Sequence, residues 1–474
     1  MKVQVTASVA TSLLEILFSG VIFGWPSLQF ALEQEGYFSN LCANKSVSNS
    51  SGHDVPVTCD QSDAHFNLIF TLTTSTQLIL SFPNGFILDR LGTWVFRGIA
   101  NTLYSSGMIM MATSSPETSY ILYPAVIFMG VSGLALLTSN FQLANFSQTF
   151  KGLIITFMNG MFDSSAVVFL IIKILYESGF SIQSSFLVLT GISVLLGLRT
   201  FLLMPRKLIP FMPPANLKFG WEELFYLLRK RRSQRMVGRS QSSSREEVLS
   251  EENEDEREEE QINRETLTFR DCLKTGIFWT NLFHYVIGQF RIVFFIGTFL
   301  QWIKAFDEAN NISRLTNIFG ALLLCGFAFA PLNGILIDSV TKYFRKNVAD
   351  HKNVCLRATF ASMTVTSFLL IVLSITATLQ SALPSFVLLV LARAFVYSGN
   401  SAFVSLNFPV QHLGKLYGLT NAIAGLFGLI QFALFRVAQT VDPEFHYINV
   451  SFLIASCLTL VHPIFLLRAA FARS

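Results

Sequence analysis

Apolar runs of about 20 residues recur along nearly the whole chain, and they constrain its fold more than any other feature. A helix of that length crosses roughly 30 Å of hydrocarbon. Hydrophobic residues make up 51% of the 474 residues and charged residues 14%, which lies well outside the composition of soluble domains. The chain is therefore predicted to be an all-α polytopic membrane protein.

Twelve such spans are expected, six on each side of a long polar segment. They cover residues 8–30, 66–88, 95–113, 120–143, 153–176, 182–203, 276–303, 316–338, 356–379, 384–406, 416–439 and 447–467. This order divides the chain into an N-terminal six-helix half (1–204), a central loop (205–270) and a C-terminal six-helix half (271–474).

A short motif is repeated at corresponding places in the two halves. Phe82–Gly92 has the sequence FPNGFILDRLG and closes the second apolar run, and Pro331–Asp338, PLNGILID, closes the eighth. Both contain proline, Asn-Gly and Gly-x-x-x-Asp, and such self-similarity indicates an internal duplication. We therefore expect a 6+6 arrangement whose halves are related by a pseudo-twofold repeat.

Lysine and arginine in the short loops indicate which side faces the cytoplasm. If the N-terminus lies inside, the inner side holds Arg90, Arg97, Lys151, Lys342, Arg345, Lys346, Lys352, Arg357, Lys415, Arg468 and Arg473, and the outer side keeps Lys45, Lys304, Arg314 and Arg436. Both termini and the central loop are thus expected in the cytoplasm. Because the basic residues flank the membrane, the expected partner is the lipid bilayer and not nucleic acid.

The first outer loop, Glu33–His65, contains two N-glycosylation sequons, at Asn44 and Asn49. Cys42 and Cys59 lie in the same oxidising compartment, so a disulfide between them is expected, with two free thiols as the alternative. The six cysteines form no Cys-x-x-Cys pair and no zinc-like Cys/His spacing, so no metal site is expected.

The central loop changes from basic (Arg229–Arg239) to acidic (Glu246–Glu260). A polar segment with such blocks of charge cannot bury enough apolar surface to fold alone, so it is predicted to be largely disordered. Ser233 follows the basic run, and Ser243 and Ser244 precede acidic residues, which makes the three serines candidate phosphorylation sites. The alternative is a solvated linker without a regulatory role.

The first copy of the repeated motif resembles the signature of the major facilitator superfamily. The matching residues are Gly85, Asp89, Arg90 and Gly92, and the second copy keeps Gly334 and Asp338 but has Ser339 in place of the arginine. The resemblance implies a latch at the cytoplasmic gate. In such a latch, glycine lets helices approach and the Asp–Arg charges make a polar contact that breaks and reforms.

Further segments are similar to the solute carrier 43 family of that superfamily. They are Asn159–Ala166, Phe169–Glu177, Arg199–Arg206, Phe408-Pro409, His412 and Gly414–Leu419, with Arg393 and Asn400. The likeness is greater to the branch that carries purine nucleobases than to the branch that carries large neutral amino acids, although Gln289–Arg291 is more like the latter. The resemblance implies sodium-independent facilitated transport at the plasma membrane, with no cofactor and no enzymatic activity. We expect a functional monomer.

Ionisable side chains within the apolar spans point to the substrate site. Each costs roughly 2.5–3.5 kcal/mol on insertion scales and needs a partner or a purpose. They are Glu15, Asp163, Lys173, Arg291 and Arg393. In a facilitator fold, helices one, four, seven and ten line the central cavity, so Glu15, Arg291 and Arg393 are expected to face it and Asp163 to lie beside it. The alternative is that the acids pair with arginines to hold helices together.

A neutral planar heterocycle such as a purine needs aromatic faces and a few donors and acceptors along its edge. Asn159, Asp163, Gln289, Arg291, Arg393 and Asn400 offer that edge chemistry, and Glu15 is a further candidate. An amino-acid substrate would instead need a fixed charge for its carboxylate, which Arg291 offers. A third alternative is a receptor or scaffold that no longer transports. No nucleotide-binding loop and no catalytic motif supports a pump or an enzyme.

Overall fold

The computed structural model describes residues 2–42, 59–146, 151–206, 209, 220, 268–306, 309–346, 350–409 and 412–472. All regular secondary structure in these residues is helical. The N-terminal half holds α1 (Lys2–Leu17), η1 (Val21–Gly24), α2 (Trp25–Glu35), η2 (Ser39–Cys42), α3 (Asp60–Ala112), η3 (Pro116–Ile121), α4 (Leu122–Asn140), η4 (Phe141–Phe146), α5 (Lys151–Ser164), α6 (Val167–Glu177) and α7 (Ile182–Leu203). The C-terminal half holds α10 (Phe269–Leu273), α11 (Gly276–Gly297), α12 (Phe299–Lys304), α13 (Ala309–Leu324), α14 (Gly326–Phe344), α15 (His351–Thr378), α16 (Ala382–Asn407), α17 (Leu413–Gly428), α18 (Ile430–Val441), α19 (His446–Leu458) and α20 (Val461–Phe471).

Each of the twelve expected spans coincides with one helix, with part of the long helix α3, or with two or three consecutive helical segments. By length and composition, eight helices of the described chain could cross a membrane, and the bent pair α13–α14 makes a ninth. The remaining three spans are the two parts of α3, which is broken at Gly92, and α11 with α12. The all-α polytopic fold predicted from the sequence is confirmed.

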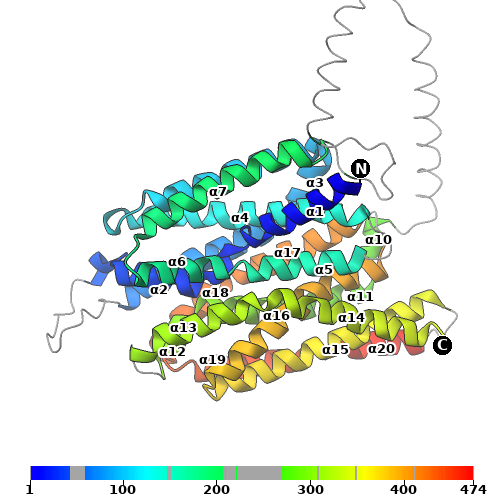
Figure 1. Ribbon diagram of the computed structural model, residues 1–474. Coiled ribbons are helices and arrows are strands. Elements are labelled where there is room, and N and C mark those ends of the chain that lie inside the picture. Colours follow the sequence, from blue (N-terminus) through cyan, green and yellow to red (C-terminus); the bar gives the residue numbers. More distant parts are fainter. Residues whose placement is uncertain are drawn as a thin grey trace, which may run out of the picture.

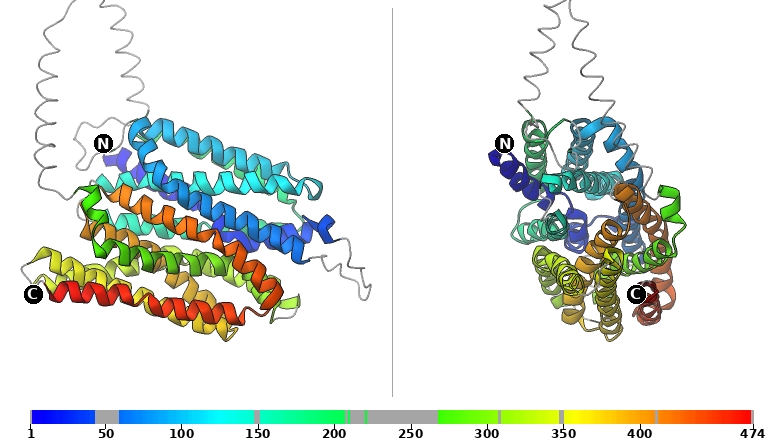
Figure 2. Two further views of the ribbon diagram at one scale, coloured as in Figure 1. Left: turned by 180° about the vertical axis from the view of Figure 1, so that it is seen from behind. Right: turned by 90° about the vertical axis from the view of Figure 1, so that its right-hand side faces the viewer.

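The helices run side by side, with the N-terminal half in one layer and the C-terminal half in the other (Figures 1 and 2). Both chain ends lie at the same end of the bundle, as an even number of crossings requires (Figure 1). Large apolar side chains on the outer face of α7 are exposed, for example Leu187 and Leu195 at 65% and 67%. Such a face suits contact with lipid. The domain boundaries at 204 and 271 stay a prediction.

The fifth and eighth expected spans are both broken where they contact each other between the halves. The fifth span divides between α5 and α6, and the eighth bends by 44° between α13 and α14. The hydroxyl of Ser164 lies 2.8 Å from the carbonyl oxygen of Leu324 and 2.9 Å from the backbone nitrogen of Phe327, so it bonds to both sides of the second break. A Cβ atom at Gly160 would lie 2.9 Å from Cα of Phe327, so glycine is required for this close approach.

The first copy of the repeated motif, Phe82–Gly92, ends in a turn that only glycine adopts readily. Gly92 has φ +73°, in the left-handed region that disfavours side chains, and it separates the second and third spans. Gly85 was expected to allow a close approach of two helices. In this conformation no such approach is seen there, since a Cβ atom built at Gly85 meets nothing within 4 Å. Close packing is seen instead at Gly418, where a Cβ atom would lie 3.0 Å from Cα of Phe82.

The disulfide between Cys42 and Cys59 is present, and it joins the end of η2 to the start of α3. The glycosylation sites Asn44 and Asn49 lie outside the described residues, as do the candidate phosphorylation sites Ser233, Ser243 and Ser244. These five assignments stay predictions. The outer loop is shorter than Glu33–His65, because α2 continues to Glu35 and α3 already begins at Asp60.

Candidate functional site

A buried ion pair joins the two halves beside the broken helices. Nη2 of Arg393, on α16, lies 2.7 Å from Oδ1 of Asp163, the last residue but one of α5. Both side chains are almost fully buried, at 1% and 8% exposure. The ring of Phe23 in η1 lies under the guanidinium, 3.7 Å from Cζ to the ring centre, which is a cation–π contact. Phe162 packs edge-on against Phe23.

Tyr397 and Gln289 complete this central cluster. Tyr397 is one helical turn beyond Arg393, and its ring centre lies 5.8 Å from the guanidinium carbon and 6.5 Å from the ring centre of Phe23. Gln289 of α11 lies next to the Tyr397 hydroxyl. Among the described residues, no hydrogen-bond partner reaches Nε or Nη1 of Arg393, the hydroxyl of Tyr397 or Oε1 of Gln289. Buried polar atoms are normally paired, so four such atoms in one place indicate a ligand or water site.

The charges of the central cluster cancel. Asp163 contributes one negative charge and Arg393 one positive charge, and the aromatic and amide groups around them are neutral. A neutral solute can enter such a site without leaving a buried charge uncompensated.

Arg291, expected to face the cavity, lies within the C-terminal half. Its Nε donates to the hydroxyl of Ser374 on α15 at 3.3 Å, and Phe295 and Phe452 flank its guanidinium at 5.5 and 5.0 Å. Ser374 in turn contacts Ser456 on α19. In this conformation Arg291 of α11 therefore packs against α15 and α19, and its Nη2 has no hydrogen-bond partner among the described residues.

The two asparagine candidates lie in different surroundings. Asn400 accepts from Nδ2 of Asn281 at 2.9 Å and donates to the hydroxyl of Thr420 at 3.1 Å, so it links α11, α16 and α17 within one half. Asn159 precedes Asp163 by one helical turn and donates to the carbonyl oxygen of Ile155. Asp163, Arg393 and Gln289 are thus the three expected residues that the fold brings together.

Glu15 lies in an ion cluster inside the N-terminal half. Its carboxylate is 2.5 Å from Nη2 of Arg97 on α3 and 2.6 Å from Nη1 of Arg199 on α7, and Asn140 on α4 donates to it at 2.9 Å. The carboxylate is 1% exposed. This is the pairing that the sequence left open as the alternative to substrate contact.

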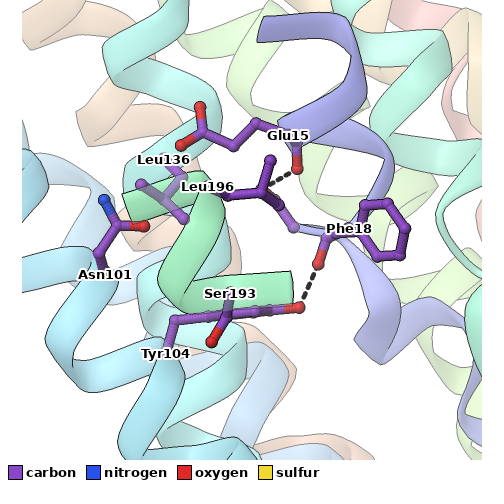
Figure 3. A pocket seen from close by; sticks show the side chains of 8 residues that line it. Glu15, Phe18, Asn101, Tyr104, Leu136, Ser193 and Leu196 are labelled. Atoms are coloured by element: carbon purple, nitrogen blue, oxygen red, sulfur yellow. Dashed lines mark hydrogen bonds between the residues drawn. The ribbon is translucent and has the colours of Figure 1, made fainter. Parts of the chain in front are cut away.

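A small cavity adjoins the Glu15 cluster (Figure 3). Its volume of about 10 Å³ is close to that of a single water site. Asn101, Tyr104 and Ser193 line it together with Glu15, and the Tyr104 hydroxyl donates to the carbonyl oxygen of Phe18, where α1 ends (Figure 3). The cavity is too small for an organic substrate.

Ion pairs also join the halves at the end of the bundle opposite the termini. Nζ of Lys304 lies 3.0 Å from Oε2 of Glu33 and 3.7 Å from Oδ1 of Asp63, which connects α12 to α2 and α3. Lys173 of α6 binds Ser313 and Asn317 of α13 at 2.7 Å each, and it also pairs with Glu177. These contacts hold the two halves together at this end of the bundle in this conformation.

The latch residues at the opposite end are less engaged. Arg90 and Asp338 are exposed, and within the described part of the chain no ion pair includes either of them. Gly334 lies near Thr156 of α5, since a Cβ atom there would be 3.7 Å from its hydroxyl. The latch of Asp89 and Arg90 stays a prediction.

The sequence did not single out Phe23 or Tyr397. Tyr397 follows Arg393 by four residues, which places both on one face of a helix, and that spacing was a usable signal. Phe23 carried no such signal, because its position depends on the short η1 turn between two helices.

Two layers of broken membrane-spanning helices that meet at a buried, charge-balanced polar cluster define a secondary transporter. Residues 21–431 match the Major Facilitator Superfamily, and the chain belongs to that family. The resemblance stated from the sequence motifs is thereby confirmed.

Named relatives refine this placement. The chain is 34% identical to equilibrative nucleobase transporter 1 of Bos taurus, over 96% of this chain and 94% of the relative. It is 24% identical to the human large neutral amino acids transporter small subunit 3, over 96% and 92%. A crystal structure of the human organic anion transporter MFSD10 has the same fold, with a TM-score of 0.57 at 13% identity, covering 98% of this chain and 99% of that one.

Proposed function

We propose that this protein is a facilitative, sodium-independent transporter of purine nucleobases, such as adenine, guanine and hypoxanthine. The two halves rock about the central cluster, so that the site faces each side of the membrane in turn. In this proposal the protein lies in the plasma membrane, with both termini and the central loop in the cytoplasm. It acts as a monomer.

The observation that carries the proposal is the charge balance of the central cluster. An amino acid brings a carboxylate and an ammonium group. In a buried site, each of these needs an opposite charge of the protein that is not already paired. Asp163 and Arg393 already neutralise one another at 2.7 Å. Arg291, the charge that an amino-acid carboxylate would use, bonds to Ser374 and packs against Phe452 within the C-terminal half, and its Nη2 has no hydrogen-bond partner among the described residues. A neutral heterocycle with polar edges suits this cluster better.

Similarity supports the same choice. The relative named for nucleobase transport shares 34% identity with this chain, against 24% for the relative named for large neutral amino acids. Gln289–Arg291 is the segment that favours the amino-acid alternative.

Uptake of radiolabelled adenine in transport-null cells tests the proposal, with unlabelled guanine and leucine as competitors. Guanine is expected to block uptake and leucine to leave it unchanged. Block by leucine alone would establish the amino-acid alternative. Reconstitution into liposomes separates both from a scaffold, because a scaffold gives no flux above empty vesicles. The same assay with and without a proton gradient tests whether transport is uncoupled.

A further inference from the structure

The unpartnered atoms of the central cluster differ in hydrogen-bonding character. Oε1 of Gln289 is an acceptor, and the Tyr397 hydroxyl can act as either donor or acceptor. Arg393 offers Nε and Nη1 as donors, and one of them can form a fork with the second hydrogen of Nη2, whose other hydrogen faces Asp163. Gln289 and Arg393 are buried, at 2% and 1% exposure, and Tyr397 is partly buried. Leaving these atoms unpaired in a dry site costs free energy, so a ligand that pairs with them gains affinity.

The two edge groups match the two kinds of purine. A glutamine amide pairs with a 6-aminopurine through two bonds, accepting from the exocyclic amino group and donating to N7. A guanidinium donates two bonds to the O6 and N7 acceptors of a 6-oxopurine. The cluster offers one group of each type, on α11 and α16, and the Tyr397 hydroxyl lies beside Gln289.

We propose that Gln289 and Arg393 divide substrate recognition between them, Gln289 reading the 6-amino edge and Arg393 the 6-oxo edge, with Tyr397 bonding to both classes. This inference rests on the proposed function and deepens it. The site then accepts both adenine and hypoxanthine because each finds a bidentate partner, and N7 is the acceptor common to both.

Substitution of single residues separates the two edges. In Gln289→Met, which keeps the side-chain length and removes both amide atoms, the ratio of adenine to hypoxanthine uptake efficiency is expected to fall about tenfold, within the range of a lost bidentate pair. Arg393→Lys keeps the positive charge beside Asp163 but removes the two parallel N–H donors of the guanidinium. In this variant the ratio of adenine to hypoxanthine uptake efficiency is expected to rise. Tyr397→Phe is expected to lower uptake of both bases and to leave the ratio unchanged.

Tyr285→Phe is the matched control. It removes the same hydroxyl from a buried tyrosine, but this hydroxyl donates to Asn421 at 2.6 Å, outside the set of three residues. The ratio and the KM for both bases are expected to match the wild type. Surface biotinylation of every variant corrects for the amount of protein, and Gln289→Leu replaces Gln289→Met if the latter does not reach the surface.

A substrate lacking one atom gives an independent test. 7-Deazaadenine has no N7 acceptor, so wild-type protein is expected to bind it several-fold more weakly than adenine, and Gln289→Met is expected to bind the two alike. Equal loss of adenine and hypoxanthine in Gln289→Met, or continued discrimination against 7-deazaadenine in that variant, overturns the inference. Absence of purine uptake by the wild type would instead refute the proposed function.

Discussion

Arg393 and Asp163 lie 2.7 Å apart and link a helix of each half at the level where α5 ends. The pair therefore spans a surface that must part if the halves rock. Glu15 and its arginines, by contrast, belong to a single half. Two ion clusters that look alike in the sequence thus have different consequences when they are broken.

Asp163→Ala and Arg393→Ala are each expected to abolish uptake while leaving surface expression intact. The pair lies between the halves, at a contact that must part when they rock, so its loss is expected to affect the transport cycle more than the packing inside either half. Uptake of adenine and surface biotinylation measure the two effects. The double variant Asp163→Asn/Arg393→Gln restores charge balance without the charges. If it transports normally, the two residues serve only to neutralise one another; normal uptake in either single variant would remove that residue from the site.

Glu15→Gln is expected to act mainly on folding. It leaves Arg97 and Arg199 buried without their anion, and breaking a buried pair in this way costs about 3–5 kcal/mol. Less protein should reach the surface, and its melting temperature in detergent should fall. Glu15→Asp, which keeps the charge, is the control. A Glu15→Gln protein of normal stability that has lost uptake would return Glu15 to the substrate site.

The outer ion pairs predict a pH dependence. Burial and the negative charge of Glu33 raise the pKa of Asp63 to about 6, although Lys304 opposes the shift; Asp60 and Gln301 are its other neighbours. Glu33 and Asp63 in turn raise the pKa of Lys304 against the effect of burial, so Lys304 stays charged. A raised carboxyl pKa means that the closed outer end binds a proton more readily than an open end with a solvated Asp63. Falling pH therefore favours closure.

Between pH 7.5 and 5.5, protonation of Asp63 changes the free-energy difference between the closed and open outer ends by roughly 1 kcal/mol. This corresponds to a few-fold shift in their ratio. Uptake from the outside is expected to slow by that factor on acidification. Asp63→Asn, which cannot titrate, should flatten the profile, whereas Asp60→Asn should keep it. An unaltered pH profile in Asp63→Asn would show that another group senses the proton.

The unequal motif copies predict unequal effects at the cytoplasmic end. Asp89 is followed by Arg90, whereas Asp338 is followed by Ser339. Asp338 is exposed and has no ion pair among the described residues. Asp89→Asn is therefore expected to slow transport more than Asp338→Asn, measured as initial uptake rates at equal surface amounts. The reverse order would contradict a latch in the first half.

The sequence by itself determined the class of fold and its family. Continuous apolar runs of about 20 residues cross a bilayer as helices, so the spans were predictable from the sequence, although those in α3 and in α11–α12 are not selected by length and composition alone. Repeated motifs located the duplication, and the shared compartment of Cys42 and Cys59 anticipated their disulfide. The helix breaks were not predicted, because the polar residues Asp163–Ser165 in the fifth span are also compatible with a continuous membrane helix. Contacts with the neighbouring helices decide that the chain breaks there.

Only the tertiary structure decided how the membrane charges pair. Glu15, Asp163, Arg291 and Arg393 carry equal weight in the sequence, because hydropathy shows that a charge lies within a span but not which residue pairs with it. The packing gives Glu15 two arginines within one half, surrounds Arg291 with serine and aromatic side chains, and places Arg393 opposite Asp163 between halves. Ion pairing depends on distances of a few ångströms between residues more than 80 positions apart, and such distances exist only once the helices have packed.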